Sequence, residues 1–356
     1  MKKIISAVLI LFSASFAFAQ EVPQKPLTQT EYVKMLYVLE KTPGKKDEIV
    51  EAIRKRGIGF ELTDGLRGLT RSKGRNDSDL QRTLEEAARR KANPTTAKLP
   101  NEKEAAEIIE KTRANTLAAV EEMPDFTVKQ LVSRGIAYAG TNNWKSIDKL
   151  TIAVNYSATK GEQYRVLAVN GDRVNAEAGS DYDKLDGTTS KGEFVEALKR
   201  IFTAERKTEF ALLDTDVMRN RQSVVYQFNI ALENNKGSGV TLKDANYSSV
   251  PAGQKGKIWV DRDTFRVLRV EYHLTDIPSD FPVKSVSHSI DYDFVIIGGE
   301  KYLLPSSSDF RGTVKGSDIL VENRNLIRFK EYQRYGAEVK ILDGDEEEVP
   351  EEKPKP

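Results

Sequence analysis

Few side chains in this 356-residue chain could carry acid–base or metal chemistry. There are two histidines, His273 and His288, and no cysteine. A zinc site needs several Cys, His or carboxylate ligands at short spacing; the two histidines are not so spaced, and we expect neither a metal nor another cofactor. His288 falls between Val286 and Ile290 on the apolar side of its segment, which indicates a buried, hydrogen-bonded imidazole. His273 falls on a polar side.

The remaining polar motifs are better explained as turns than as sites. Two carboxylates within 261–263 fall short of the six to eight oxygens that calcium takes, so this segment is expected to be a turn. The pairs Asn-Gly at 170–171 and Gly-Gly at 298–299 fit hairpin turns rather than phosphate-binding loops. The serines at 306–308 have no histidine close by in sequence, which leaves a serine nucleophile open but unsupported. We therefore expect no catalytic residue and no enzymatic activity.

The elements that would position these residues are strands with one apolar face. Ile258 and Val260 run into a polar turn, after which even-numbered apolar residues alternate with mostly charged ones as far as Leu274. A period of two places alternate side chains on opposite faces of a strand, so this stretch predicts a hairpin with one apolar side. The residues that we expect to line that side, or to face it from a helix, are Tyr226, Phe228, Leu268, Val270, Tyr272, Val286, Ile290, Tyr292, Phe294, Phe194 and Leu198.

The two ends of the chain are expected to lie outside any folded domain. Residues 1–19 combine two lysines, an apolar run and small residues at Ala17 and Ala19, as in a secretory signal peptide. No later segment is apolar enough to cross a membrane, so we expect an exported protein, periplasmic in a host with an outer membrane. The acidic, proline-containing residues 343–356 are expected to be a disordered tail.

Residues 20–91 are predicted to form a small helical module. Apolar residues recur at helical spacing, and Gly57 is a plausible helix end. The basic run at 54–75 fits a solvated helical face, and export argues against a nucleic-acid partner. We expect this module to dock, either on the rest of the chain or on a protein partner, with residues 92–103 as a linker.

Residues 104–342 are predicted to form an α+β domain. A helix at 105–121 ends at Pro124, and the chain then alternates as in an antiparallel sheet. One clear helix interrupts it at 190–205, where Ser190 and Glu193 have the spacing of a capping box. The predicted fold class is a curved antiparallel β half-barrel closed by helices and preceded by the all-α module.

The apolar face must be covered. Leaving ten such side chains in water would forfeit ~15 to 30 kcal/mol, at ~1.5 to 3 kcal/mol each. The net stability of a protein is only ~5 to 15 kcal/mol. The two helices are the available covers, and the space beneath them is either a filled core or a cavity for an apolar guest.

Four segments resemble one known superfamily. They are EEMPDFTVKQLVSRG, EQYRVLAVNGDRV, GKIWVDRDTFRVLRVEYHLTDIPSDFP and SIDYDFVIIGGEKYLLPSSSDF. Their order over about residues 104–335 resembles the outer-membrane lipoprotein carrier and lipoprotein-sorting superfamily of the LolA, LolB and RseB type, most specifically at 257–305. The helical module and the long stretches at 171–190 and 233–255 depart from that pattern.

The resemblance implies an open half-barrel whose cavity holds acyl chains or senses lipoproteins. The resulting hypothesis is an exported, non-catalytic protein that binds a hydrophobic ligand, either a lipid or a lipoprotein acyl chain. The alternative is an envelope scaffold with a filled barrel that binds partners through the basic helical module.

Overall fold

The structure is a computed structural model of the whole chain. It describes residues 25–94, 98–174, 182, 185, 187–235, 237, 239–242, 248–316 and 319–334. The expected signal peptide at 1–19 and the acidic tail at 343–356 lie outside the described residues. No helix in the described ranges is long and apolar enough to cross a membrane.

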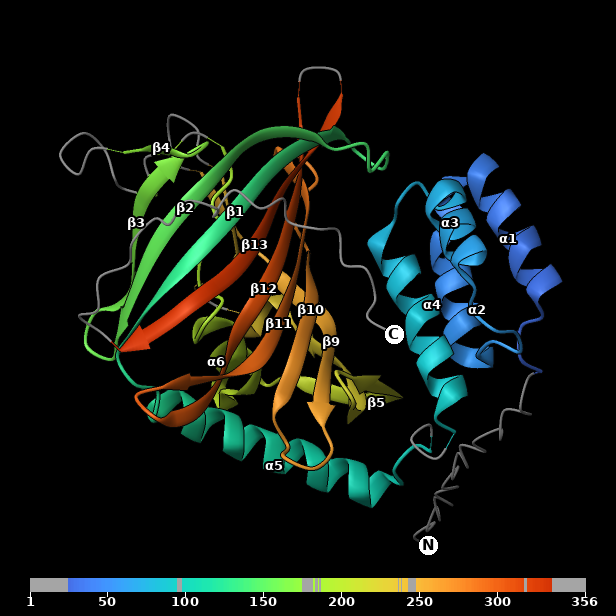
Figure 1. The fold of residues 1–356 in the computed structure, drawn as a ribbon, viewed down its shortest axis with the longest axis horizontal. Coiled ribbons are helices and arrows are strands. Elements are labelled where there is room, and N and C mark those ends of the chain that lie inside the picture. Colours follow the sequence, from blue (N-terminus) through green and yellow to red (C-terminus); the bar gives the residue numbers. More distant parts are fainter. Residues whose placement is uncertain are drawn as a thin grey trace, which may run out of the picture.

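The predicted fold class is confirmed by one large sheet. Its strands follow the order β4-β3-β2-β1-β13-β12-β11-β10-β9-β6-β5, every neighbouring pair is antiparallel, and the two edges do not meet. Figure 1 shows this sheet bent into an open half-barrel. Its strands are β1 (Phe126–Tyr138), β2 (Lys145–Ser157), β3 (Gly161–Val169), β4 (Asp172–Arg173), β5 (Glu209–Met218), β6 (Arg221–Ile230), β9 (Gly253–Asp261), β10 (Val267–Thr275), β11 (Val283–Ile297), β12 (Glu300–Lys315) and β13 (Leu320–Arg334).

Two helices cover one face of the sheet, which we call the inner face. They are α5 (Glu102–Glu121) and α6 (Glu196–Phe202), and we call them the roof helices. In Figure 1, α5 crosses the open side of the half-barrel and α6 lies within its curve. The helix expected at 190–205 is shorter than predicted, because Gly192 adopts a φ of +85°. The Ser190–Glu193 pair therefore precedes the helix and does not cap it.

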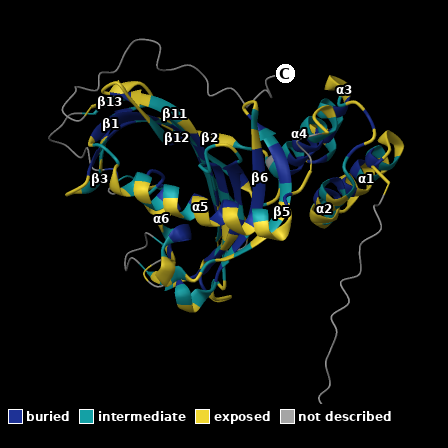
Figure 2. Cartoon of the chain, turned by 90° about the horizontal axis from the view of Figure 1, so that it is seen from below, coloured by how far each residue is buried: buried dark blue, intermediate teal, exposed yellow. Residues whose placement is uncertain are grey.

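Apolar side chains pack in three clusters on the inner face. One joins β6, β9, β10 and β11 to both roof helices. A second joins β1, β2, β3 and β13 to Phe194 and Val195, just before α6. A third lies under a separate hairpin of β7 (Gly239–Thr241) and β8 (Ser249–Pro251). The inner face is thus covered by the chain itself along most of its length (Figure 2).

Four helices precede the sheet and share a core of their own. They are α1 (Gln29–Lys41), α2 (Lys46–Arg56), α3 (Asp64–Lys73) and α4 (Ser78–Ala92). The cap at Thr28 pairs with Glu31 in a capping box, and Gly57 ends α2 with a φ of +67°. Short 3₁₀ helices lie at Pro43–Lys45, Ala204–Arg206 and Leu232–Asn234.

The helical module docks on the opposite, outer face of the sheet. Helix α4 packs beside β5, and Arg89 of α4 lies 3.2 Å from Asp216 of β5. The indole Nε1 of Trp259 also donates to Asp216, at 3.1 Å. Beneath this contact Trp259 packs with Leu268, Val225 and Met218 as a small apolar cluster.

Candidate ligand-binding site beneath the roof helices

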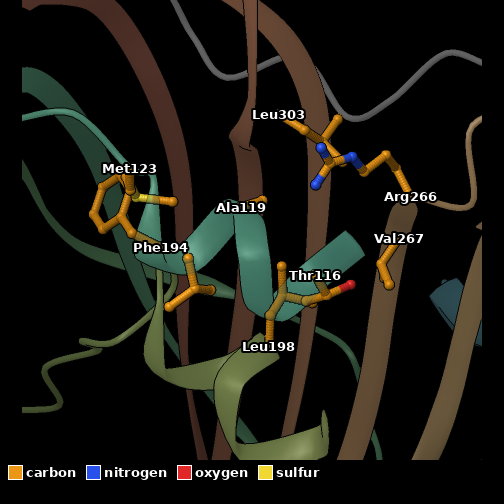
Figure 3. Close-up of a pocket in the computed structure, with 9 residues that line it drawn as sticks. Thr116, Ala119, Met123, Phe194, Leu198, Arg266, Val267 and Leu303 are labelled. Atoms are coloured by element: carbon orange, nitrogen blue, oxygen red, sulfur yellow. The ribbon is translucent and has the colours of Figure 1, made fainter. Parts of the chain in front are cut away.

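A small apolar cavity lies where the two roof helices meet the sheet. Its volume is about 20 Å³, which holds about one water molecule. We call it the seam cavity. Figure 3 shows side chains from α5, α6, β10 and β12 converging on it. The lining residues are Thr116, Ala119, Val120, Met123, Phe194, Leu198, Arg266, Val267 and Leu303.

The residues expected to line an apolar site fall into different places. Phe194 and Leu198 reach the seam cavity. The others that face inward as expected are packed against the roof helices and against one another in the largest inner cluster, and they are Tyr226, Phe228, Val270, Ile290 and Tyr292, with Tyr272 at its margin. In this conformation they form a core. Their role in holding a ligand stays a prediction.

Three of the expected lining residues lie neither in the largest inner cluster nor at the seam cavity. The pairing of β9 with β10 shifts between Val267 and Arg269, and this bulge turns Leu268 to the outer face against Trp259. Val286 belongs to the cluster under the β7–β8 hairpin. Phe294 is half-buried, and its ring lies under the charged ends of two cations, Arg221 at 4.8 Å and Lys301 at 4.4 Å.

The turn between β9 and β10 holds α5 against the sheet. The Nη1 of Arg266 donates to the carbonyl of Asn115 at 2.5 Å, and the Nδ2 of Asn115 donates to the carbonyl of Thr264 at 3.2 Å. Near the start of the helix, the hydroxyl of Tyr226 donates to the carbonyl of Ala105 at 2.8 Å. Arg113 of α5 also donates to the carbonyl of Phe202 at 2.9 Å, and Glu104 pairs with Arg262. Polar contacts thus fix α5 at separate points along its length.

A buried polar cluster lies beside the apolar one, at the junction of α6 with the sheet. The Nε2 of His288 lies 2.6 Å from the Oγ of Ser308, and its Nδ1 lies 3.0 Å from the hydroxyl of Tyr272. The Oε1 of Glu193 accepts from Ser190 at 2.5 Å and lies 3.7 Å from His288 Nε2. The Oε2 of Glu193 is buried and has no hydrogen-bond partner among the described residues.

The environment of this cluster keeps His288 neutral. Burial lowers the pKa of His288 to about 4 and raises the pKa of Glu193 to about 7. The buried, hydrogen-bonded state predicted for His288 is thereby confirmed. The contact with Ser308 was missed, because the sequence alone did not show how the two strands pair; the register places Ser308 opposite Ile290, two residues from His288.

The geometry of the cluster differs from that of a serine nucleophile site. In such a site the acid holds the ring nitrogen opposite to the one that faces the serine. Here Tyr272 occupies that position, while Glu193 approaches the nitrogen that Ser308 already contacts. Ser308 is 2% exposed and His288 is 5% exposed, so a substrate has no access to either in this conformation.

No protein-family model and no curated protein matches this chain. Among solved structures it is similar to a LolA superfamily protein from Nitrosomonas europaea, with 10% identity over 64% of this chain and 94% of that one and a TM-score of 0.27. It is also similar to a DUF1329 family protein from Desulfovibrio piger, with 8% identity over 65% and 94% of the chains and a TM-score of 0.29.

A third similar structure is the MucA/MucB complex of Pseudomonas aeruginosa, with 11% identity over 62% of this chain, 93% of that one and a TM-score of 0.17. The first of the three carries the name of the superfamily that the sequence resembles.

The basic run of the helical module is largely neutralised within the module. Arg56 pairs with Glu31 at 2.9 Å and Arg67 with Glu85 at 2.7 Å. Lys73 pairs with Glu40 of α1. A surface that has satisfied its own charges offers little attraction to an anionic partner. Among the described residues, no group of three or more His, Asp or Glu is placed to hold a metal ion.

Proposed function

We propose that this chain is an exported, non-catalytic binding protein that holds an apolar ligand, a lipid or a lipoprotein acyl chain, between the inner face of the sheet and the roof helices. In a host with an outer membrane its place would be the periplasm. In the conformation described here both roof helices pack against the inner face. The observation that carries the proposal is the apolar seam cavity between a large apolar sheet face and two separately attached helices.

Helix α5 covers that face with few large buried apolar side chains. The buried side chains of α5 are Ala105, Ile108, Ile109, Thr112 and Thr116, so only two of them are large hydrophobic residues. Helix α6 is seven residues long and buries Leu198, Ile201 and Phe202. A helix buried as α5 is costs less to lift than one held by interdigitating leucines and phenylalanines, so α5 is the more easily moved of the two.

Loading requires the roof to move. Ligand pockets measure about 300 to 1,000 Å³, far more than the 20 Å³ of the seam cavity. Helix α5 is the element that can move away from the sheet. Its contacts with the β9–β10 turn include the hydrogen bonds of Asn115 with Thr264 and Arg266, and water can replace such bonds when the helix moves.

A reversible crosslink tests this proposal. The chain has no cysteine, so the double variant Asn115→Cys/Thr264→Cys introduces one unique thiol pair at the contact that holds α5. With the pair open, the protein should bind a fluorescent fatty acid; with the pair closed by a short thiol crosslinker, we expect binding to fall at least about tenfold. The single variant Asn115→Cys, treated in the same way, is the control. Equal binding in both states would place the guest elsewhere.

The second candidate is an envelope scaffold with a permanently filled interior. The close packing of the inner clusters favours it. A scaffold would ignore the fatty acid whether the crosslink is open or closed, and it would purify from membranes without lipid detectable by native mass spectrometry. These two results together would overturn the ligand-binding proposal.

A further inference from the structure

A second pocket lies on the other side of α6 from the seam cavity. Its volume is about 400 Å³, and it separates α6 from the β7–β8 hairpin. Leu198, two residues before Arg200 on α6, lines the seam cavity, whereas Arg200 lines this pocket. Residues two apart on a helix point to nearly opposite sides, so the two spaces do not share a wall of the helix. The described lining residues are Arg200, Gly237, Gly239, Thr241, Ser249, Val250 and Pro251.

The charged group of this pocket is the guanidinium of Arg200. Arg200 is half-buried and, among the described residues, it donates no hydrogen bond and forms no ion pair. Arg206, a few residues further on, bonds instead to the carbonyl of Asn234 at 3.3 Å. A guanidinium has five donors, and a half-buried one with no acceptor forgoes charge-assisted hydrogen bonds that a ligand could supply.

The hairpin side of the pocket provides hydroxyl groups and open space. Thr241 and Ser249 face each other across the hairpin, with 3.3 Å between their side-chain oxygens. Gly239 is required by the hairpin itself, since a Cβ there would lie 2.0 Å from the carbonyl oxygen of Val250. Gly237 has open space where a side chain would be, so the pocket stays wide at this point.

We propose that this pocket binds a phosphate group, with the guanidinium of Arg200 as its charged partner and the hydroxyls of Thr241 and Ser249 as further donors. A carboxylate is satisfied by one guanidinium fork. A phosphate has more acceptor oxygens, spread in tetrahedral directions, and it matches a guanidinium combined with hydroxyl donors on a second wall. Phosphate binding at Arg200 does not require an apolar ligand in the seam cavity.

Two sources could present such a group, namely a free phosphate or phosphate monoester and the head group of an anionic phospholipid. Calorimetric titration of the full chain with inorganic phosphate and with glycerol 1-phosphate tests the first source. Sedimentation with phosphatidylglycerol vesicles, compared with phosphatidylcholine vesicles, tests the second. Binding in either arm that depends on Arg200 supports the pocket and identifies the source.

A matched pair of variants makes the test specific. Arg200→Gln should weaken binding at least about tenfold, the loss expected for a charge-assisted hydrogen bond. Lys199→Gln removes the same charge from an exposed position of the same helix and should change binding by less than about twofold. Because Arg200 bonds to no described residue, its replacement should leave the circular dichroism spectrum and the urea midpoint unchanged.

A spectroscopic reading adds a second, local measurement. Arg200 is one of the charges that lower the pKa of His288, and the chain has two histidines, so their NMR signals are easily resolved. Bound phosphate should offset the charge of Arg200 and raise the pKa of His288, while exposed His273 stays unchanged. The proposal is overturned if the wild type binds in neither arm, if Arg200→Gln binds like the wild type, or if both variants lose binding equally.

Discussion

At the scale of single residues, two buried groups at the roof junction titrate in opposite directions. Glu193 and His288 lie 3.7 Å apart, and burial favours the neutral form of each. Because the folded pKa of Glu193 is raised from 4.5 to about 7, its contribution to stability is lost as the pH rises from about 4.5 to 7. The folded pKa of His288 is lowered from 6.5 to about 4, so its contribution is gained as the pH rises across about 4 to 6.5. Over their shared range the two effects partly cancel.

The variant Glu193→Gln separates these two effects. Above pH 7 the folded wild type holds a buried carboxylate, and the amide removes that cost; a shift from 4.5 to about 7 corresponds to about 3 kcal/mol. We expect Glu193→Gln to be more stable than the wild type by about that amount at pH 8, and equal to it within about 0.5 kcal/mol at pH 4.5. Urea unfolding at both pH values measures the difference.

An exposed neighbour provides the control for this prediction. Glu196→Gln removes a carboxylate from the same segment, where it is exposed, and should change the stability by less than about 0.5 kcal/mol at either pH. A stability difference of Glu193→Gln that does not vary with pH would show that the carboxyl group is not held neutral in the folded protein.

At the scale of elements, the helical module and the sheet meet through charged side chains. From α4, Arg89 lies 3.2 Å from Asp216 and Arg90 lies 3.0 Å from Asp214. Glu86 of the same helix is buried, and burial raises its pKa. Contacts between domains are commonly more polar than a domain core, and such contacts permit relative movement.

Replacing Arg89 by alanine tests the contribution of this contact. Asp216 is 1% exposed and would keep only the indole of Trp259 and a backbone amide as donors, so we expect a loss of about 1 to 3 kcal/mol in the free energy of unfolding. Solvent screens this ion pair in part, because the side chain of Arg89 is 35% exposed, and the loss is smaller than for a fully buried pair. Glu51→Gln, at an exposed pair with Lys55 on α2, should leave the free energy of unfolding unchanged within the error of the measurement. A similar loss of unfolding free energy in both variants would show that the contact between Arg89 and Asp216 stabilises the protein no more than an exposed ion pair does.

Much of the element layout could be predicted from local sequence signals. The helical spacing of apolar residues in 20–91, the end of α2 at Gly57 and the alternation of the β9–β10 hairpin all predicted structure that is present. What failed depended on single backbone irregularities. The bulge after Val267 reversed the facing of Leu268, and the positive φ of Gly192 delayed the start of α6. The spacing of hydrophobic residues indicates neither a β-bulge nor a positive φ angle.

The site was harder to predict than the fold, for a different reason. The contact between His288 and Ser308 and the docking of α4 beside Asp216 join positions far apart in the sequence. Their formation depends on strand register and on packing between separately folded parts. Sequence spacing could indicate that His288 was buried, but not which groups it would meet.

At the scale of the whole molecule, the helical module and the sheet have separate apolar cores. The core of α1 to α4 is one apolar cluster, and the inner face of the sheet holds the others. Between them lies the charged contact of α4 with the outer face, where apolar packing is limited to the small cluster around Trp259. Apolar burial is the main source of cooperative stability, so the module and the sheet should unfold as separate units.

This separation predicts two unfolding transitions in urea. Trp144→Phe leaves Trp259, beneath the docked module, as the single indole, because the chain has two tryptophans. We expect its emission to shift to the red together with the loss of helical circular dichroism, at a lower urea concentration than the loss of the sheet. The module should leave first because a core of about 65 residues buries less surface than the sheet domain does. Coincident midpoints for both signals would mean that the charged contact couples the two parts into one cooperative unit.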